Sequence, residues 1–231
     1  MNELEPDFSE AQYPGFYKFA RHAVAGYIRT HGGLNVVGAK NFSQEGRVIL
    51  TANHESMNDP LSIGVAFPRA LYSLAKKELW SPRGLYIGRV LGRLGSIPVD
   101  RKRAGHNNMR KSLEVTEKDR AFLSFLQGTR KHESDEIEGK DGLAWLATRS
   151  STELIPCPVV PIGLSTSNLR FHRPIQLVAG EPIYGNPGGN TQAIRKAFTR
   201  ELEASVFNLR AQALQLDKDG AGRSHCITTE G

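Results

Sequence analysis

Short apolar runs and longer stretches with a helical repeat alternate along the chain. The short runs are often β-branched and are bounded by glycine, proline or charged residues, which is the pattern of β-strands. We therefore expect strands at Asn35–Val37, Val48–Thr51, Leu71–Ala75, Ser96–Val99, Ala121–Leu126, Val159–Leu164 and Ile175–Ala179.

The longer stretches predict helices between these strands. In the last of them Ile194, Phe198 and Leu202 recur every four residues, the stripe of a helix that packs on one face, and Asn190 or Thr191 is a suitable N-cap. The expected helices are Pro14–Thr30, Pro60–Phe67, Gly84–Leu91, Asn107–Lys118, Lys140–Thr148 and Thr191–Leu214.

Alternating strands and helices predict an α/β fold with a mixed, mostly parallel sheet flanked by helices. The chain of 231 residues contains no internal repeat and no linker rich in serine or glycine, so we expect a single domain. Its predicted limits are a flexible N-terminus over residues 1–13, a folded α/β domain over 14–215 and a disordered tail over 216–231.

The first predicted helix is amphipathic, with aromatic residues such as Phe16 and Phe19 interleaved with Lys18 and Arg21. This composition is typical of a helix lying in a membrane interface, and also of a first helix that packs on the domain's own core. No apolar run is long enough to span a bilayer, and the acidic start of the chain does not resemble a signal peptide. Contact with a membrane is therefore expected to be peripheral.

The overall charge narrows the class of partner only slightly. The formal net charge is +6, which is compatible with nucleic acid, anionic lipid or phosphorylated substrates. The cations are scattered rather than interleaved with aromatic residues, so we expect no nucleic acid.

The two cysteines, Cys157 and Cys226, have no metal-binding spacing and form no disulfide framework. We expect no metal site.

The stretch "LTANHESMNDP" places His54 five residues before Asp59, directly after a predicted strand. In a strand-to-helix loop Asp59 can turn back to one imidazole nitrogen and leave the other as a general base. Asp59 followed by Pro60 also has the pattern of an N-cap and a first helical residue. In the alternative interpretation Asp59 is only that cap and His54 is an ordinary loop residue.

Two further segments place an arginine after a predicted strand. They are "GSIPVDR", Gly95–Arg101, and "FLQGTRK", Phe125–Lys131. Arginines at strand ends can converge on a phosphate, although a single one is more often simply solvated. A third segment, "VVPIGL", Val159–Leu164, has a proline inside an apolar strand, which predicts an edge strand or the wall of a cleft.

Taken together and in order, these blocks resemble the motifs of the glycerolipid acyltransferase family, which includes the 1-acylglycerol-3-phosphate acyltransferases. The resemblance covers roughly Tyr17 to Ile183 and implies that the domain over 14–215 is an acyltransferase domain. It rests on "NHESMND", "GSIPVDR", "FLQGTRK" and "VVPIGL", with support from the connecting segments "AKKELW" and "KDGLAWLA".

The resemblance implies a role for each matching residue. His54 is implied to be the general base and Asp59 the residue that orients it, while Val160 and Pro161 lie in the motif linked to the acyl donor. The residues implied to bind the phosphate of the acceptor are Gly95, Arg101, Gly128, Thr129 and Arg130.

The implied reaction transfers a fatty acyl group from a thioester to the hydroxyl of lysophosphatidate, giving phosphatidate. The expected co-substrate is acyl-CoA or acyl carrier protein, with no further cofactor. The expected location is the cytoplasmic side of a membrane, with peripheral attachment. The segment Lys131–Gly139 is predicted to be a solvated loop or a lid over the third motif.

One position departs from the family's pattern. The third motif usually has a glutamate before its glycine, and this chain has Gln127, which we include among the substrate-binding residues; the usual proline before it is Leu126. Glutamine keeps an acceptor oxygen but loses the charge. Acylation of another lysolipid, glycerol phosphate or a hydroxylated lipid, or a catalytically weak lipid-binding relative, therefore remain alternatives.

Overall fold

The computed structural model describes residues 9–43, 45–81, 85–100, 106–128, 141–165, 173–185, 191–219 and 229–230. Its helices are α1 Pro14–Thr30, α2 Asp59–Ala66, α3 Leu85–Arg93, α4 His106–Thr116, α5 Asp141–Ser150 and α6 Gln192–Asp219, with short 3-10 turns at Ala39–Asn41 and Lys77–Trp80. Its strands are β1 Leu34–Val37, β2 Val48–Ala52, β3 Leu71–Lys76, β4 Ser96–Val99, β5 Ala121–Phe125, β6 Pro158–Ser165, β7 Ile175–Ala179, β8 Ile183–Tyr184 and β9 Thr229–Glu230.

Within the described residues these strands form one mixed sheet in the order β4-β3-β5-β2-β6-β7-β1-β9, with β8 paired to β6. Neighbouring strands are parallel except where β6 meets β7 and β8. This arrangement confirms the predicted α/β domain with a mostly parallel sheet.

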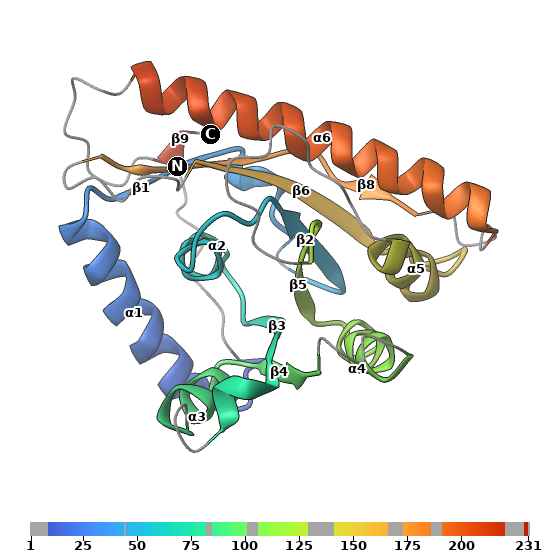
Figure 1. Ribbon diagram of the computed structural model, residues 1–231, viewed down its shortest axis with the longest axis horizontal. Coiled ribbons are helices and arrows are strands. Elements are labelled where there is room, and N and C mark those ends of the chain that lie inside the picture. The colour runs from blue at the N-terminus through green and yellow to red at the C-terminus, as the bar shows by residue number, and fades with distance from the viewer. Residues whose placement is uncertain are drawn as a thin grey trace.

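Helices cover both faces of the sheet, because the central strands are apolar on both sides. In β2, Val48 and Leu50 pack in the cluster that includes Ile28 of α1 and Ile63 of α2. Ile49 points the other way, into the cluster formed with α4, α5 and α6. Figure 1 shows α6 along one side of the sheet and α1 and α2 on the other.

The parallel strands direct their following loops to one edge of the sheet. Strands β4, β3, β5, β2 and β6 run in the same direction, so the residues after each of them lie at the same carboxyl edge. His54 follows β2 and Gln127 follows the adjacent strand β5. This topology brings together segments that lie far apart in the sequence.

The predicted elements are confirmed in type, with differences at their ends. The last helix extends to Asp219, so the tail predicted from residue 216 begins inside α6. Of the predicted flexible N-terminus only residues 9–13 are described, and Glu10 among them pairs with the buried Arg69 at 2.7 Å. The sequence analysis missed β8 and β9, since two residues are too short for a periodic pattern.

The prediction that the strand containing Pro161 lies at an edge was wrong. Strand β6 is central, with β2 on one side and β8 and β7 on the other. The carbonyl of Pro161 accepts a hydrogen bond from Gly180 at 2.9 Å, on the side where pairing passes from β8 to β7. A residue's N–H and C=O point to the same side of a strand, so the missing N–H of Pro161 faces this gap. The proline therefore takes no hydrogen bond from the pairing with β2, and lacks only the reciprocal bond to Gly180 where the β6–β7 pairing ends.

Gly163 allows α6 to lie directly against β6. A Cβ atom at this position would stand 2.1 Å from the carbonyl carbon of Leu209 and 2.2 Å from the backbone nitrogen of Arg210. Only glycine leaves room for this approach, which seats the long C-terminal helix on the central strand.

We predict that Gly163→Ala lowers the free energy of unfolding by about 1–3 kcal/mol, because the added methyl group collides with helix backbone rather than with a movable side chain. Urea unfolding measures the change. The matched control is Gly26→Ala on α1, where an added Cβ meets nothing within 4 Å. That variant should gain about 0.5–1 kcal/mol. Equal stability of the two variants would contradict the prediction.

Candidate active site

His54 and Asp59 are in contact at the carboxyl edge of the sheet. The imidazole Nδ1 lies 2.9 Å from Asp59 Oδ2, and the histidine is 8% exposed. An ionised carboxylate only accepts hydrogen bonds, so Nδ1 carries the hydrogen and donates it. Nε2 of the neutral ring then keeps its lone pair. The predicted contact is therefore present, and it has the arrangement of an oriented general base.

Asp59 also organises the loop that carries the histidine. Its Oδ2 accepts backbone hydrogen bonds from Glu55 at 2.7 Å and from Ser56 at 2.8 Å. Asp59 is the first residue of α2, and Asn58 takes the N-cap position without a side-chain cap bond. The interpretation of Asp59 as the cap was thus wrong by one residue. Its carboxylate turns back to the loop, where the positive end of α2 also favours a negative charge.

Strand β5 and the turn after it hold His54 from a second side. The Phe125 ring stacks on the imidazole, with centroids 4.0 Å apart and planes 16° apart. Gln127 is 5% exposed, and its Oε1 accepts the backbone N–H of His54 at 2.8 Å. Gln127, at the position where the third motif departs from the family's pattern, therefore bonds to the loop that carries His54, a contact that the sequence analysis did not predict.

Three residues around the loop were not identified from the sequence. Asn53 bonds to the backbone of Leu164 on β6, and Glu55 pairs with Arg210 of α6. Asn53 and Glu55 lie inside the quoted "NHESMND" block, so their position on either side of His54 was a sequence signal that could have identified them. Arg210 is 155 residues from Glu55 and lies on the predicted last helix, where nothing in the sequence distinguishes it.

The structure does not bring Gly95 to this site. Gly95 precedes β4, so it lies at the amino edge of the sheet, opposite to His54. Its φ is +86°, and a side chain there would meet the Tyr72 ring at 3.0 Å. These constraints account for the glycine without a substrate, and its role in substrate binding stays a prediction.

Val160 and Pro161, the residues implied for the acyl donor, are buried in β6. Val160 belongs to the core cluster on the α1 and α2 side of the sheet. Neither side chain lies open to a bound donor, so any influence on the donor has to pass through the packing of the strand.

Only some of the residues predicted to bind phosphate belong to the described part of the structure. Arg101, Thr129 and Arg130, together with the segment 131–139, lie outside the described residues, and their roles stay predictions. Gly128 is described and exposed; its φ is +67°, and its N–H bonds to the carbonyl of Phe125 at 2.9 Å, which closes a tight turn.

A cation also lies at this edge of the sheet. Lys77, directly after β3, pairs with Asp100, directly after β4, at 2.7 Å. The hydrogen bond to Asp100 raises the pKa of Lys77 above its usual value.

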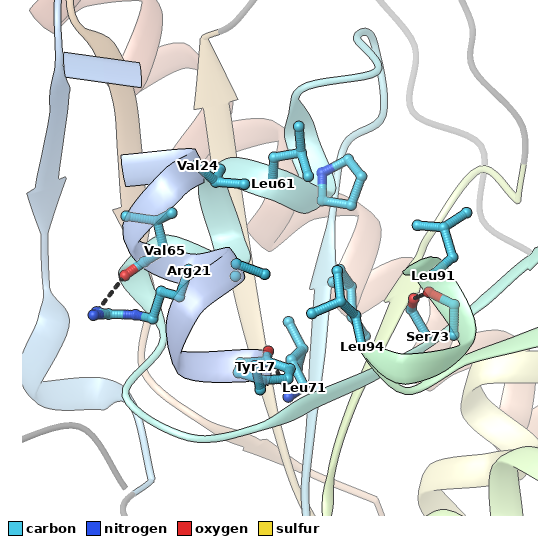
Figure 2. A pocket seen from close by; sticks show the side chains of 14 residues that line it. Tyr17, Arg21, Val24, Leu61, Val65, Leu71, Ser73, Leu91 and Leu94 are labelled. Atoms are coloured by element: carbon cyan, nitrogen blue, oxygen red, sulfur yellow. Dashed lines mark hydrogen bonds between the residues drawn. The ribbon is translucent and has the colours of Figure 1, made fainter. Parts of the chain in front are cut away.

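An apolar pocket lies beneath α2, the helix that begins at Asp59. Helices α1, α2 and α3 and strands β3, β4 and β5 border it, and Figure 2 shows Leu61, Leu91 and Leu94 pointing into it. Arg21 lies at its side and donates to the carbonyl of Val65 at 2.7 Å. The described residues that line it are Tyr17, Ala20, Arg21, Val24, Pro60, Leu61, Gly64, Val65, Leu71, Ser73, Leu91, Leu94, Ser96 and Leu123.

Cys157 is not a candidate nucleophile. It is fully buried, and burial raises the pKa of its thiol to about 12. The reactive thiolate is therefore scarce at neutral pH.

Comparison with known proteins agrees with this geometry. The profile of the family described as "Acyltransferase" matches residues 33–165, from β1 to the end of β6. The chain belongs to the acyltransferase family. The matched region contains the His54–Asp59 pair and the loop after β5.

Over the aligned residues, curated relatives are about a quarter identical to this chain. The 1-acyl-sn-glycerol-3-phosphate acyltransferase of Borreliella burgdorferi is 28% identical over 151 residues, which are 64% of this chain and 58% of the relative. The enzyme of the same name from Limnanthes douglasii is 26% identical over 166 residues, 70% of this chain and 56% of the relative. The matched parts thus span less than two thirds of these relatives.

The fold also matches a solved structure. The crystal structure of the 1-acyl-sn-glycerophosphate acyltransferase PlsC from Thermotoga maritima superimposes with a TM-score of 0.61 and 20% identity, covering 93% of this chain and 91% of that one. At this identity the likeness confirms the shared fold.

We predict that Gln127→Leu destabilises the protein by about 1–3 kcal/mol, because the buried N–H of His54 loses its acceptor. Chemical denaturation measures the loss. Gln212→Leu serves as the control, since Gln212 is exposed on α6. If both leucine variants unfold at the wild-type midpoint, the hydrogen bond does not stabilise the loop.

Proposed function

We propose that this protein transfers a fatty acyl group from an acyl thioester to the free hydroxyl of lysophosphatidate, giving phosphatidate. The observation that carries the proposal is the His54–Asp59 contact within the family's matched region. The names of the matched curated relatives support lysophosphatidate as the acceptor. The donor is acyl-CoA or acyl carrier protein, and the chemistry is the same for both.

In the proposed reaction Nε2 of His54 takes the proton of the acceptor's hydroxyl while its oxygen attacks the thioester carbonyl. The tetrahedral intermediate then collapses, the carbon–sulfur bond breaks, and the thiolate leaves and takes up the proton from Nε2, which restores the neutral base. Asp59 keeps Nδ1 occupied, so that Nε2 is the nitrogen that faces the hydroxyl. No covalent acyl-enzyme is needed.

The apolar pocket is suited to an acyl chain. Most of the residues that line it are leucine, valine or alanine. The lining includes Pro60 and Leu61, the two residues that follow Asp59 in the sequence. Burying methylene groups there stabilises a long-chain substrate by about 0.8 kcal/mol for each group removed from water. A chain in this pocket would have its reacting end at the carboxyl edge of the sheet.

Gln127 is compatible with lysophosphatidate as the acceptor. Its amide oxygen is occupied by the backbone of His54, so it serves the loop as an acceptor without a charge. Acylation of a different lysolipid, glycerol phosphate or a hydroxylated lipid would use the same base. A weak lipid-binding relative without turnover is the alternative of another class.

We further propose peripheral attachment to an anionic membrane through α1 and α3, which border the pocket. None of the helices in the described part of the chain combines the length and apolar character that a membrane span requires. Phe19 is 71% exposed and Tyr86 82% exposed, and each lies on a helix that contains cations and no acidic residue. The two helices meet where Arg93 lies over the ring of Phe16, 5.5 Å from its centroid.

We predict that His54→Ala lowers kcat/KM by about 10²–10⁴-fold, because the general base is removed. The measurement is transfer of a labelled acyl group from acyl-CoA to lysophosphatidate. His22→Ala, which removes an exposed histidine of α1, should retain wild-type turnover.

Turnover that survives His54→Ala would contradict the general-base role. If wild-type protein binds lipid but acylates lysophosphatidate, other lysolipids and glycerol phosphate at no measurable rate, the lipid-binding alternative is favoured.

We predict that Ile87→Glu weakens binding to vesicles containing phosphatidylglycerol about tenfold, because an exposed apolar side chain of α3 is replaced by an anion. Cosedimentation measures the bound fraction. Ile155→Glu is the control, since Ile155 is 54% exposed against 56% for Ile87 but lies outside α1 and α3. Equal loss in the two variants would contradict attachment through α3.

A further inference from the structure

We propose that Arg210, on the C-terminal helix α6, is a positioning residue for the catalytic loop and acts through Glu55. The inference rests on the proposed role of His54 as the general base. Helix α6 lies outside residues 33–165, where the family profile matches, so no family motif points to Arg210.

The first link in this network is Asn53, the residue between β2 and His54. Its side chain accepts the N–H of Leu164 at 2.8 Å and donates to the carbonyl of the same residue at 3.0 Å. Pairing of β2 with β6 ends at Ala52 and Ile162, so the amide of Asn53 supplies the next rung of the ladder. This fixes the start of the loop on the central strand.

Glu55, on the other side of His54, is the second link. Its carboxylate is almost fully buried; Oε1 accepts hydrogen bonds from Asn53 at 3.2 Å and from Nε of Arg210. Its backbone N–H donates to Asp59 Oδ2, the same oxygen that contacts His54. The position of Glu55 and the position of the imidazole are therefore coupled through one carboxylate oxygen.

Helix α6 supplies the third link because it lies unusually close to β6. Gly163 lets the backbone at Leu209 and Arg210 rest on the strand, and Arg210 is largely buried at this contact. From there its guanidinium neutralises Glu55. A buried carboxylate without a partner is strongly disfavoured, so removal of Arg210 favours states in which Glu55 turns toward water.

Movement of Glu55 would withdraw its N–H from Asp59 and displace the residue next to His54. A displacement of about 1 Å at a reacting group can cost about a hundredfold in rate. The expected defect therefore concerns the chemical step rather than the binding of either substrate.

The test compares Arg210→Met with Arg210→Lys and with the matched control Arg200→Met, which changes an exposed arginine of the same helix. We expect Arg210→Met to lower kcat about 10–100-fold, with KM for acyl-CoA and lysophosphatidate changed less than about twofold. Arg210→Lys, which keeps the charge, should recover part of this loss, and Arg200→Met should match wild type.

A double-mutant cycle keeps the test informative if one single variant folds poorly. Glu55→Gln keeps the size of the side chain and removes its charge. If Arg210 acts through Glu55, the double variant Glu55→Gln/Arg210→Met should lose about as much kcat as one single variant does. Losses that multiply would overturn the coupling.

Amide hydrogen exchange provides a readout that does not need activity. In Arg210→Met the N–H groups of Glu55 and Ser56 should exchange at least about tenfold faster than in wild type and in Arg200→Met. Exchange at the wild-type rate, or a kcat within about twofold of wild type, would overturn the inference. If wild-type protein acylates no lysophosphatidate, the proposed function fails, and hydrogen exchange alone then decides the positioning role.

Discussion

The site depends on one carboxylate oxygen. Asp59 is fully buried, and its Oδ2 accepts hydrogen bonds from two backbone N–H groups and from the imidazole of His54. A carboxylate removed from water is tolerated only when such donors replace its hydration. The same three bonds shape the turn from β2 into α2 and orient the histidine, so the local fold and the orientation of the proposed general base have one physical cause.

The sheet and its last helix supply the surroundings of that oxygen. Adjacent parallel strands bring Phe125 and Gln127 against His54, about seventy residues away in the chain. Because Gly163 has no side chain, α6 packs directly against β6, and from there Arg210 pairs with Glu55. The loop is therefore held by groups from three regions of the chain, and its geometry is a property of the complete domain.

Two interpretations that the structure corrects share a reason. Asp59 was taken as an N-cap and Pro161 as a sign of an edge strand, each from its neighbours in the sequence. In the structure each is explained by a neighbour in space: the loop of His54, and the gap between β8 and β7. Local rules give the positions and contacts that a residue type permits, whereas tertiary contacts decide which of them the residue adopts.

The sequence by itself determined the α/β class, the type of the strands and helices that it predicted, and the placement of His54 in a strand-to-helix loop, because these follow from short-range periodicity and the spacing of five residues. Only the tertiary structure decided the strand order, the bond from Gln127 to His54 and the pairing of Glu55 with Arg210. These two contacts join residues 73 and 155 positions apart, and such pairings depend on how the faces of the sheet are filled, which no local pattern encodes.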